Sequence, residues 1–170
     1  MKYANIKYCD IANGPGVRTS LFVSGCNHRC PGCFNEIAWD FNYGKEFTED
    51  TIKNIIDSLK DGFVRGLTLL GGEPLDPANQ KCVLELIKEV RNVYNDTKSI
   101  WCYTGYLYED LLGKTEYIDE ILSNIDVLVD GPFILDKKRI TLVFAGSSNQ
   151  RIIDMKETLK NDKIILWEFE

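Results

Sequence analysis

Three cysteines lie close together near the start of the chain, where they could hold a metal centre. Cys26, Cys30 and Cys33 are separated by three and then two residues. Without a secretory signal, such a cluster is more often a metal site than a disulfide framework. Pro31 and Gly32 allow the backbone to turn, so this short loop can bring all three sulfurs to one centre. On a four-iron cluster, three thiolates leave one iron open for substrate chemistry, whereas electron carriers normally use four cysteines.

A structural zinc site is the alternative interpretation of this loop. It needs a fourth ligand, and the single histidine of the chain, His28, lies two positions from both Cys26 and Cys30. Neighbouring zinc ligands are usually separated by two or more residues, so this spacing disfavours zinc. The remaining cysteines are scattered and are interpreted as structural: Cys9, Cys82 and Cys102.

A second segment that could bind a ligand is Gly-Gly-Glu-Pro at residues 71–74, directly after an apolar stretch. Two glycines without Cβ atoms allow the backbone to approach a ligand closely, and backbone carbonyls accept hydrogen bonds from an ammonium group. Without the cysteines, this segment would be interpreted only as a turn between a strand and a helix.

The apolar pattern around both motifs predicts strands that alternate with helices. Strands are expected at residues 19–25, 66–70, 99–103, 126–130, 139–144 and 164–167. Helices are expected after Thr48, after the pair Asp76 and Pro77 as far as residue 94, and after Thr115, because these residue types commonly begin helices. Both motifs then follow a strand directly.

This alternation predicts a mostly parallel sheet, because a parallel connection needs a long crossover that a helix usually supplies. A closed barrel of eight strands and helices typically takes about 250 residues. The 170 residues of this chain are therefore expected to form a single domain, residues 1–170, with a partial, open β/α barrel. About five or six strands are expected, with ligands at their carboxyl ends.

Composition narrows the possible partners and location. The chain has 26 acidic and 20 basic residues and a net charge of −6, which disfavours a nucleic acid partner. No stretch approaches the roughly 18 to 20 apolar residues that a membrane helix needs, and no basic segment followed by an apolar run begins the chain. A soluble, cytoplasmic protein is expected.

The spacing Cys-x3-Cys-x2-Cys after the first expected strand, joined to Gly-Gly-Glu-Pro after the second, is similar to the radical S-adenosylmethionine superfamily. The resemblance implies a [4Fe-4S] cluster on the three cysteines, with the methionine part of S-adenosylmethionine bound to the open iron. It also implies a one-electron donor, such as a flavodoxin or ferredoxin, and reductive cleavage to methionine and a 5′-deoxyadenosyl radical. No side chain need act as an acid or base, because the cofactor carries the difficult chemistry.

The resemblance further implies which residues contact the cofactor. The segment that holds the amino group of the methionine part corresponds to Gly71, Gly72, Glu73 and Pro74. Two residues that flank the last cysteine, Gly32 and Phe34, are expected beside the adenosine. Thr104 and Asp130 end the third and fourth expected strands and could also reach the cofactor.

Further segments resemble the activating enzymes of glycyl-radical enzymes, in particular the subfamily that serves anaerobic ribonucleoside-triphosphate reductase. They are residues 13–18 (NGPGVR), 34–35 (FN), 130–133 (DGPF) and 146–151 (GSSNQR). The implied partner is that reductase, and the implied reaction removes an α-hydrogen from a glycine near its C-terminus. The subfamily commonly has a basic residue where this chain has Ala145, and residues 149–151 are assigned no chemical role.

Two classes of alternative remain open. The chain could be a radical S-adenosylmethionine enzyme that acts on another glycyl-radical enzyme or on a small molecule. It could also be a non-enzymatic iron-sulfur or zinc protein. The short chain leaves little barrel wall to enclose a small substrate, which favours an open face that accepts a protein loop.

Overall fold

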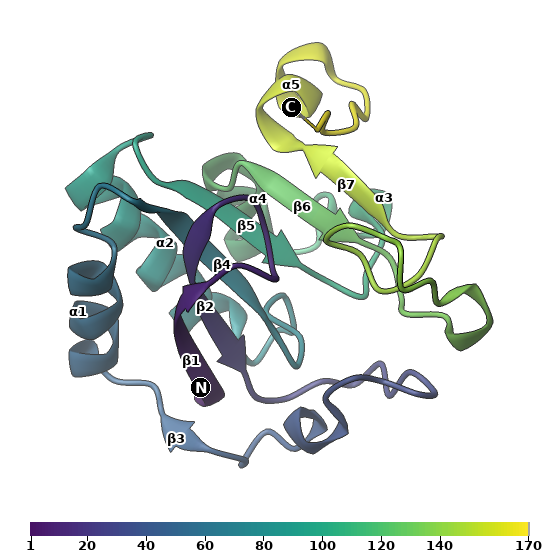
Figure 1. Ribbon diagram of the computed structural model, residues 1–170, viewed down its shortest axis with the longest axis horizontal. Helices are drawn as coiled ribbons and strands as arrows, with labels where there is room; N and C mark the ends of the chain where they lie inside the picture. Colours follow the sequence, from purple (N-terminus) through teal and green to yellow (C-terminus); the bar gives the residue numbers. More distant parts are fainter. Residues whose placement is uncertain (170) are drawn as a thin grey trace.

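A seven-stranded sheet forms the centre of the computed structural model, which describes residues 1–169 (Figure 1). The strands are β1 (Lys2–Asp10), β2 (Val17–Val23), β3 (Lys45–Glu46), β4 (Val64–Gly71), β5 (Ser99–Tyr103), β6 (Val127–Asp130) and β7 (Arg151–Asp154). The helices are α1 (Glu49–Ser58), α2 (Gln80–Tyr94), α3 (Tyr108–Leu111), α4 (Glu116–Asn124) and α5 (Met155–Asn161), with short 3-10 helices η1 (Glu36–Trp39) and η2 (Leu135–Lys137).

The sheet is parallel in the middle and antiparallel at both edges. Its order is β3-β1-β2-β4-β5-β6-β7. Strands β2, β4, β5 and β6 pair in parallel, whereas β1 pairs antiparallel with β2 and β3, and β7 pairs antiparallel with β6. The mostly parallel core is confirmed. The sheet is open and has seven strands rather than five or six, and a partial barrel is not confirmed.

Two expected strands are wrong. Residues 139–144 form no strand, because the free edge of β6 is taken by the antiparallel strand β7. Residues 164–167 contribute only an isolated bridge between Ile153 and Leu166. In turn, β1 and β7 were not expected, since β1 mixes polar and apolar residues without regular alternation and β7 has only four residues.

Two of the three expected helix starts are capped as predicted. Thr48 caps α1 through a reciprocal pair of hydrogen bonds with Thr51, and Thr115 caps α4, both as predicted. Helix α2 begins at Gln80 instead of Pro77. The carboxylate of Asp76 accepts a hydrogen bond from the Ala78 amide, which forms a turn before the helix.

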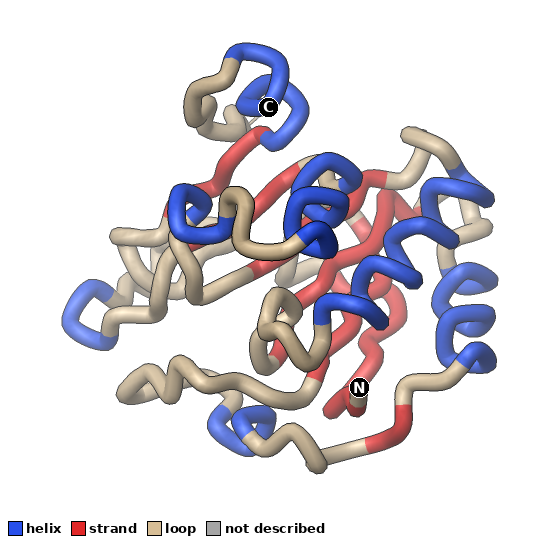
Figure 2. The backbone as a smooth tube through the Cα atoms, turned by 180° about the vertical axis from the view of Figure 1, so that it is seen from behind, coloured by secondary structure: helices blue, strands red, loops and turns tan. Residues whose placement is uncertain are grey.

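Helices α1, α2 and α4 cover one face of the sheet, as Figure 2 shows from behind. The main core lies between them and the strands, and its sheet residues alternate in the usual way: Leu21, Val23, Leu67, Leu69, Ile100, Cys102 and Leu128. The opposite face carries a smaller cluster around Trp101, Val127 and Val129. None of the helices within residues 1–169 is long and apolar enough to cross a membrane.

A buried arginine ties three strands together on that opposite face. Arg18 is fully buried, and its guanidinium donates to the Thr68 hydroxyl, to the backbone carbonyls of Leu67 and Ser99, and to the Ser99 hydroxyl. Burial lowers the pKa of Arg18 to about 10. These bonds hold β2, β4 and β5 in register beneath the cavity described next.

Candidate functional site

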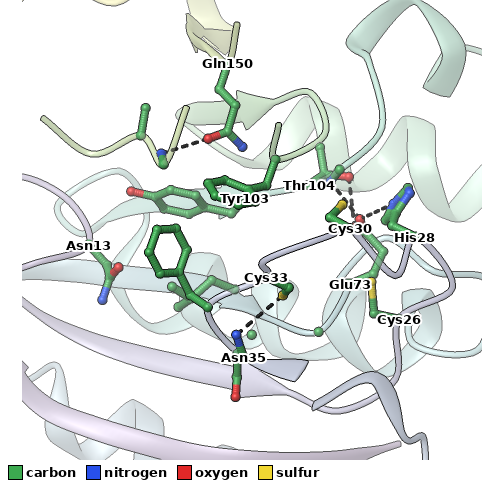
Figure 3. Close-up of a pocket in the computed structure, with 18 of the residues that line it drawn as sticks. Asn13, Cys26, His28, Cys30, Cys33, Asn35, Glu73, Tyr103, Thr104 and Gln150 are labelled. Atoms are coloured by element: carbon green, nitrogen blue, oxygen red, sulfur yellow. Dashed lines mark hydrogen bonds and ion pairs between the residues drawn. The ribbon is translucent and has the colours of Figure 1, made fainter. Parts of the chain in front are cut away.

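A cavity of about 420 Å³ opens on the sheet face that the helices leave uncovered (Figure 3). Its floor includes Phe22, Leu70 and Tyr103 from three neighbouring strands, and its walls are the cysteine loop and the segment that connects β6 to β7. The volume lies within the range of about 300 to 1,000 Å³ that is typical of small-molecule sites. The cavity therefore lies beside the carboxyl ends of the parallel strands, where ligands were expected.

The three clustered cysteines line this cavity. Cys26, Cys30 and Cys33 are all free thiols, and Cys26 is the most buried of them. Burial raises the pKa of the Cys26 thiol to about 11, so a bound cation would have to stabilise its thiolate. No group of three or more Cys, His, Asp or Glu residues within 1–169 is placed to hold a metal ion. The three free thiols line one cavity without forming such a group, and it is their number and type that match the ligand set expected for an iron-sulfur cluster.

Glu73 joins three parts of the site. Its side chain is 1% exposed, and its carboxylate accepts hydrogen bonds from the Leu75 amide, the Thr104 hydroxyl and the Gly105 amide, at 2.8 to 2.9 Å. The Nε2 atom of His28 lies 2.8 Å from the same carboxylate, and this bond raises the pKa of His28. Glu73 thus fastens the cysteine loop and the end of β5 to the end of β4.

The two glycines before Glu73 are required by close backbone packing. A Cβ atom on Gly72 would lie 2.5 Å from the carbonyl oxygen of Gly25, directly before the cysteine loop. Gly71 has a φ of +109°, and a Cβ atom there would lie 2.6 Å from the Val23 amide nitrogen. Gly71, Gly72 and Glu73 line the cavity, whereas Pro74 does not.

The structure brings some of the other expected residues to the cavity. Phe34 lines it, and its ring packs 4.9 Å from the ring of Phe133. Thr104 lines it too, but its hydroxyl donates to Glu73. Gly32 does not line it and lies against the side chain of Leu135.

Asp130 lies away from the cavity. It follows Leu128 by two residues and therefore points to the helix-covered face, where it is fully buried. Its carboxylate pairs with the Arg151 guanidinium and accepts a hydrogen bond from the Tyr108 amide. The cofactor contact expected of Asp130 has no support in this geometry.

Several cavity residues were not expected from the sequence. Tyr103 projects from β5 into the cavity, and its buried hydroxyl has no hydrogen-bond partner within residues 1–169. Burial raises the pKa of this hydroxyl. The Nε1 atom of Trp39, another residue that lines the cavity, is likewise buried without a partner within that range. Alternation with Trp101 along β5 is the one sequence signal that could have placed Tyr103 on this face.

The segment 146–151 has a bracing role. The side-chain oxygen of Gln150 accepts hydrogen bonds from the Gly146 and Ser147 amides, and its amide nitrogen donates to the Gly131 carbonyl. Asn149 donates to the carbonyl of Pro132. These bonds close the base of the long loop between β6 and β7, and Ala145 then lines the cavity.

Comparison with known proteins identifies the family. Residues 12–153 match the family model described as a 4Fe-4S single cluster domain. A protein of Pasteurella multocida is 44% identical over 154 residues, which cover 89% of this chain and 96% of the relative. Relatives from Vibrio cholerae and enterobacteria phage T4 are 42% and 39% identical, each over 89% of this chain and over 97% and 93% of their own lengths. All three are named anaerobic ribonucleoside-triphosphate reductase-activating protein.

The chain belongs to this family of activating proteins. The resemblance inferred from the cysteine spacing and the accompanying motifs is thereby confirmed. The family match supports an iron-sulfur protein over a zinc protein. Which side chains hold the cluster stays a prediction.

Proposed function

We propose that this chain generates a glycyl radical on an anaerobic ribonucleoside-triphosphate reductase, with a [4Fe-4S] cluster and S-adenosylmethionine as cofactors. The observation that carries the proposal is the placement of Cys26, Cys30 and Cys33 around one cavity, beside the end of β4, in a chain of this family. The relatives are named as activating proteins of this reductase. The three cysteines would hold the cluster, which, once reduced by a one-electron donor, would supply the electron for cleavage of S-adenosylmethionine to methionine and a 5′-deoxyadenosyl radical that takes the glycine α-hydrogen.

The residues of the chain then bind the cofactors, orient them and exclude water from them. The three cysteines hold the cluster, and the backbone at Gly71 and Gly72 accepts the ammonium group of the methionine part. Glu73 contributes through position, because its carboxylate is already engaged by the chain itself. Thr104 supports Glu73 rather than the ligand. Asp130 is left out of the proposed binding set.

Apolar side chains that line the cavity would help to keep water from the radical. They include Phe133, Leu142 and Phe144, and a dry site prevents side reactions of a reactive intermediate. Tyr103 lines the same cavity, and its buried hydroxyl, which has no hydrogen-bond partner within residues 1–169, is available to a polar group of S-adenosylmethionine or of the reductase. The electron donor is proposed to be a flavodoxin or a ferredoxin.

The test uses anaerobically reconstituted protein with S-adenosylmethionine, a chemical reductant and an anaerobic ribonucleotide reductase. Electron paramagnetic resonance should show a glycyl radical only when the reductase is present, and 5′-deoxyadenosine should be released with it. A reductase in which alanine replaces the acceptor glycine should give no glycyl signal. A silent reductase, together with turnover stimulated by a small metabolite, would favour the small-molecule alternative instead.

The ligand assignment is tested in the same preparation. Cys30→Ala should lose the bound iron and the cluster absorbance, because two thiolates do not retain the site. Cys9→Ala is the matched control and should keep both, since Cys9 lies exposed on β1. Normal iron content in the Cys30→Ala protein would overturn the assignment.

A further inference from the structure

The long loop between β6 and β7 reaches over the cysteine loop. Both project from the same side of the sheet in Figure 1, the first in green and the second in dark blue. Leu135 packs against the backbone of Gly32, and the Nζ atom of Lys138 lies 4.8 Å from the ring centroid of Phe34. Because Leu142 lines the cavity, residues 134–143 of this loop form one edge of its mouth, here called the lip.

The lip exposes large apolar side chains that no core accommodates. Ile140 is 94% exposed, Val143 is 52% exposed and Leu135 is 50% exposed, and the adjoining Phe34 is 68% exposed. Ile140 and Val143 lie in the stretch 139–144, whose apolar character suggested a strand, yet the structure leaves both side chains in solvent. Apolar side chains gathered around one opening are typical of a surface that another molecule covers.

The lip also carries three consecutive cations, Lys137, Lys138 and Arg139. None of them takes part in an ion pair within residues 1–169, and the Arg139 guanidinium donates only to backbone carbonyls of the lip. The whole chain has a net charge of −6, so this run stands against an acidic background. A partner surface that carries carboxylates would complement the positive charge of this run.

We propose that the lip is the docking surface for the reductase, and that it meets a patch of Asp or Glu and apolar side chains beside the glycine-bearing segment. This inference rests on the proposed function. Hydrogen transfer demands near contact, so the reductase chain must pass the lip to bring its glycine into the cavity. The apolar residues then supply contact area, while the cations steer and orient the approach.

The experiment reverses the charge of the lip in the reconstituted protein. The variant carries Lys137→Glu, Lys138→Glu and Arg139→Glu. Its matched control carries Lys53→Glu, Lys60→Glu and Lys81→Glu, which make the same change in net charge at exposed positions on or after α1 and on α2. A third variant, Ile140→Ser with Val143→Ser, removes apolar area from residues that are already exposed.

The lip variants should bind the reductase more weakly, on the order of tenfold for the charge reversal at low salt. Affinity is measured anaerobically by fluorescence anisotropy at several salt concentrations, and the reversed variant should lose most of the salt dependence of the wild-type protein. Iron content and cleavage of S-adenosylmethionine without reductase should stay unchanged. The glycyl radical yield should fall at low reductase concentration and recover at high concentration.

Unchanged affinity in both lip variants, or an equal loss in the control, would overturn the inference. So would slower reduction by a protein electron donor with normal reductase binding, which would assign the lip to the donor. A shifted cluster potential with normal binding would assign the cations to the cluster. These outcomes differ from failure of the proposed function, in which the wild-type protein itself yields no glycyl radical on the reductase.

Discussion

Glu73 shows how one buried carboxylate can hold a site together. Its carboxylate accepts three hydrogen bonds and contacts His28. Leu75 is a neighbour in the sequence, but the other partners lie more than 30 residues from Glu73. A glutamine at this position keeps the shape but has only one acceptor oxygen. At least one buried donor would then face an amide NH2 group.

Glu73→Gln should therefore lower the free energy of unfolding by about 1 to 3 kcal/mol, the usual cost of an unsatisfied buried group. Urea unfolding of the metal-free protein, followed by circular dichroism, measures this change. Glu85→Gln, an exposed substitution on α2, is the control and should change the free energy by less than about 0.5 kcal/mol. Equal stability of the two variants would show that Glu73 does not brace the loops.

At the level of single residues, the sequence pointed to the three cysteines and to Gly71 and Gly72, which line the cavity, but not to the bracing role of Glu73. Cysteine spacing and Gly-Gly-Glu-Pro are local patterns, so they can be recognised without a fold. The contact of Glu73 with His28 and Thr104 depends on how three strand ends meet in space. For the same reason Asp130 was expected at the cofactor, although strand alternation turns it to the other face.

Among the secondary-structure elements, β6 and β7 are joined by an ion pair in addition to their antiparallel pairing. Arg151 of β7 lies opposite Asp130 of β6, and its guanidinium binds that fully buried carboxylate and also the exposed Glu109. Loss of the arginine would leave Asp130 buried with only the Tyr108 amide as partner. Removing one member of a buried pair costs more than the pair itself contributes.

Arg151→Gln should lower the free energy of unfolding by about 3 kcal/mol at neutral pH. The hydrogen bond from Arg151 lowers the pKa of Glu109 to about 2, from an ordinary value of 4.5. Because the folded pKa is lowered, the contribution of this carboxylate is present above pH 4.5 and is lost as pH falls toward 2. The difference between wild type and variant should shrink over that interval.

Urea unfolding at several pH values tests this prediction. Glu109→Gln is the comparison, and it should cost less than about 1 kcal/mol because that carboxylate is half exposed to solvent. A cost for Arg151→Gln no larger than that for Glu109→Gln would mean that Asp130 does not need its partner.

The elements that the sequence predicted best are those with local signals. Thr48 and Thr115 cap their helices, and β5 matches its expected range, because capping and short apolar runs depend on neighbouring residues. Residues 139–144 have the composition of a strand, but the edge of β6, the strand before them, is taken by β7. The antiparallel strands β1 and β7 could not be predicted, since β1 mixes polar and apolar residues without regular alternation and β7 has only four residues.

Across the whole molecule, the two faces of the sheet differ in how they are covered. Three helices bury one face, whereas the other is closed only at one end, where Trp167 from the C-terminal segment packs 5.0 Å from Trp101. Trp101 in turn packs 5.5 Å from Phe144, a residue of the cavity wall. The aromatic cluster thus links the C-terminal segment to the long loop.

Trp167→Ala should lower the free energy of unfolding by about 2 kcal/mol, less than the roughly 3 to 5 kcal/mol of a fully buried aromatic residue. It should also speed amide hydrogen exchange in residues 141–146. Without Trp167, Trp101 loses its own packing partner and supports Phe144 less firmly. Phe63→Ala removes an aromatic ring that is already exposed and serves as the control. If exchange in Trp167→Ala is no faster than in Phe63→Ala, the C-terminal segment does not support the cavity wall.

The arrangement around Glu73 bears on any attempt to transplant this site. A synthetic peptide that copies residues 26–33 would carry the three thiols, but it would lack the carboxylate that His28 contacts. A designed host protein would need the tetrapeptide at residues 71–74 and the pair Thr104 and Gly105 as well, with three adjacent strand ends at matching heights. The smallest portable unit is therefore a corner of a sheet and not a loop.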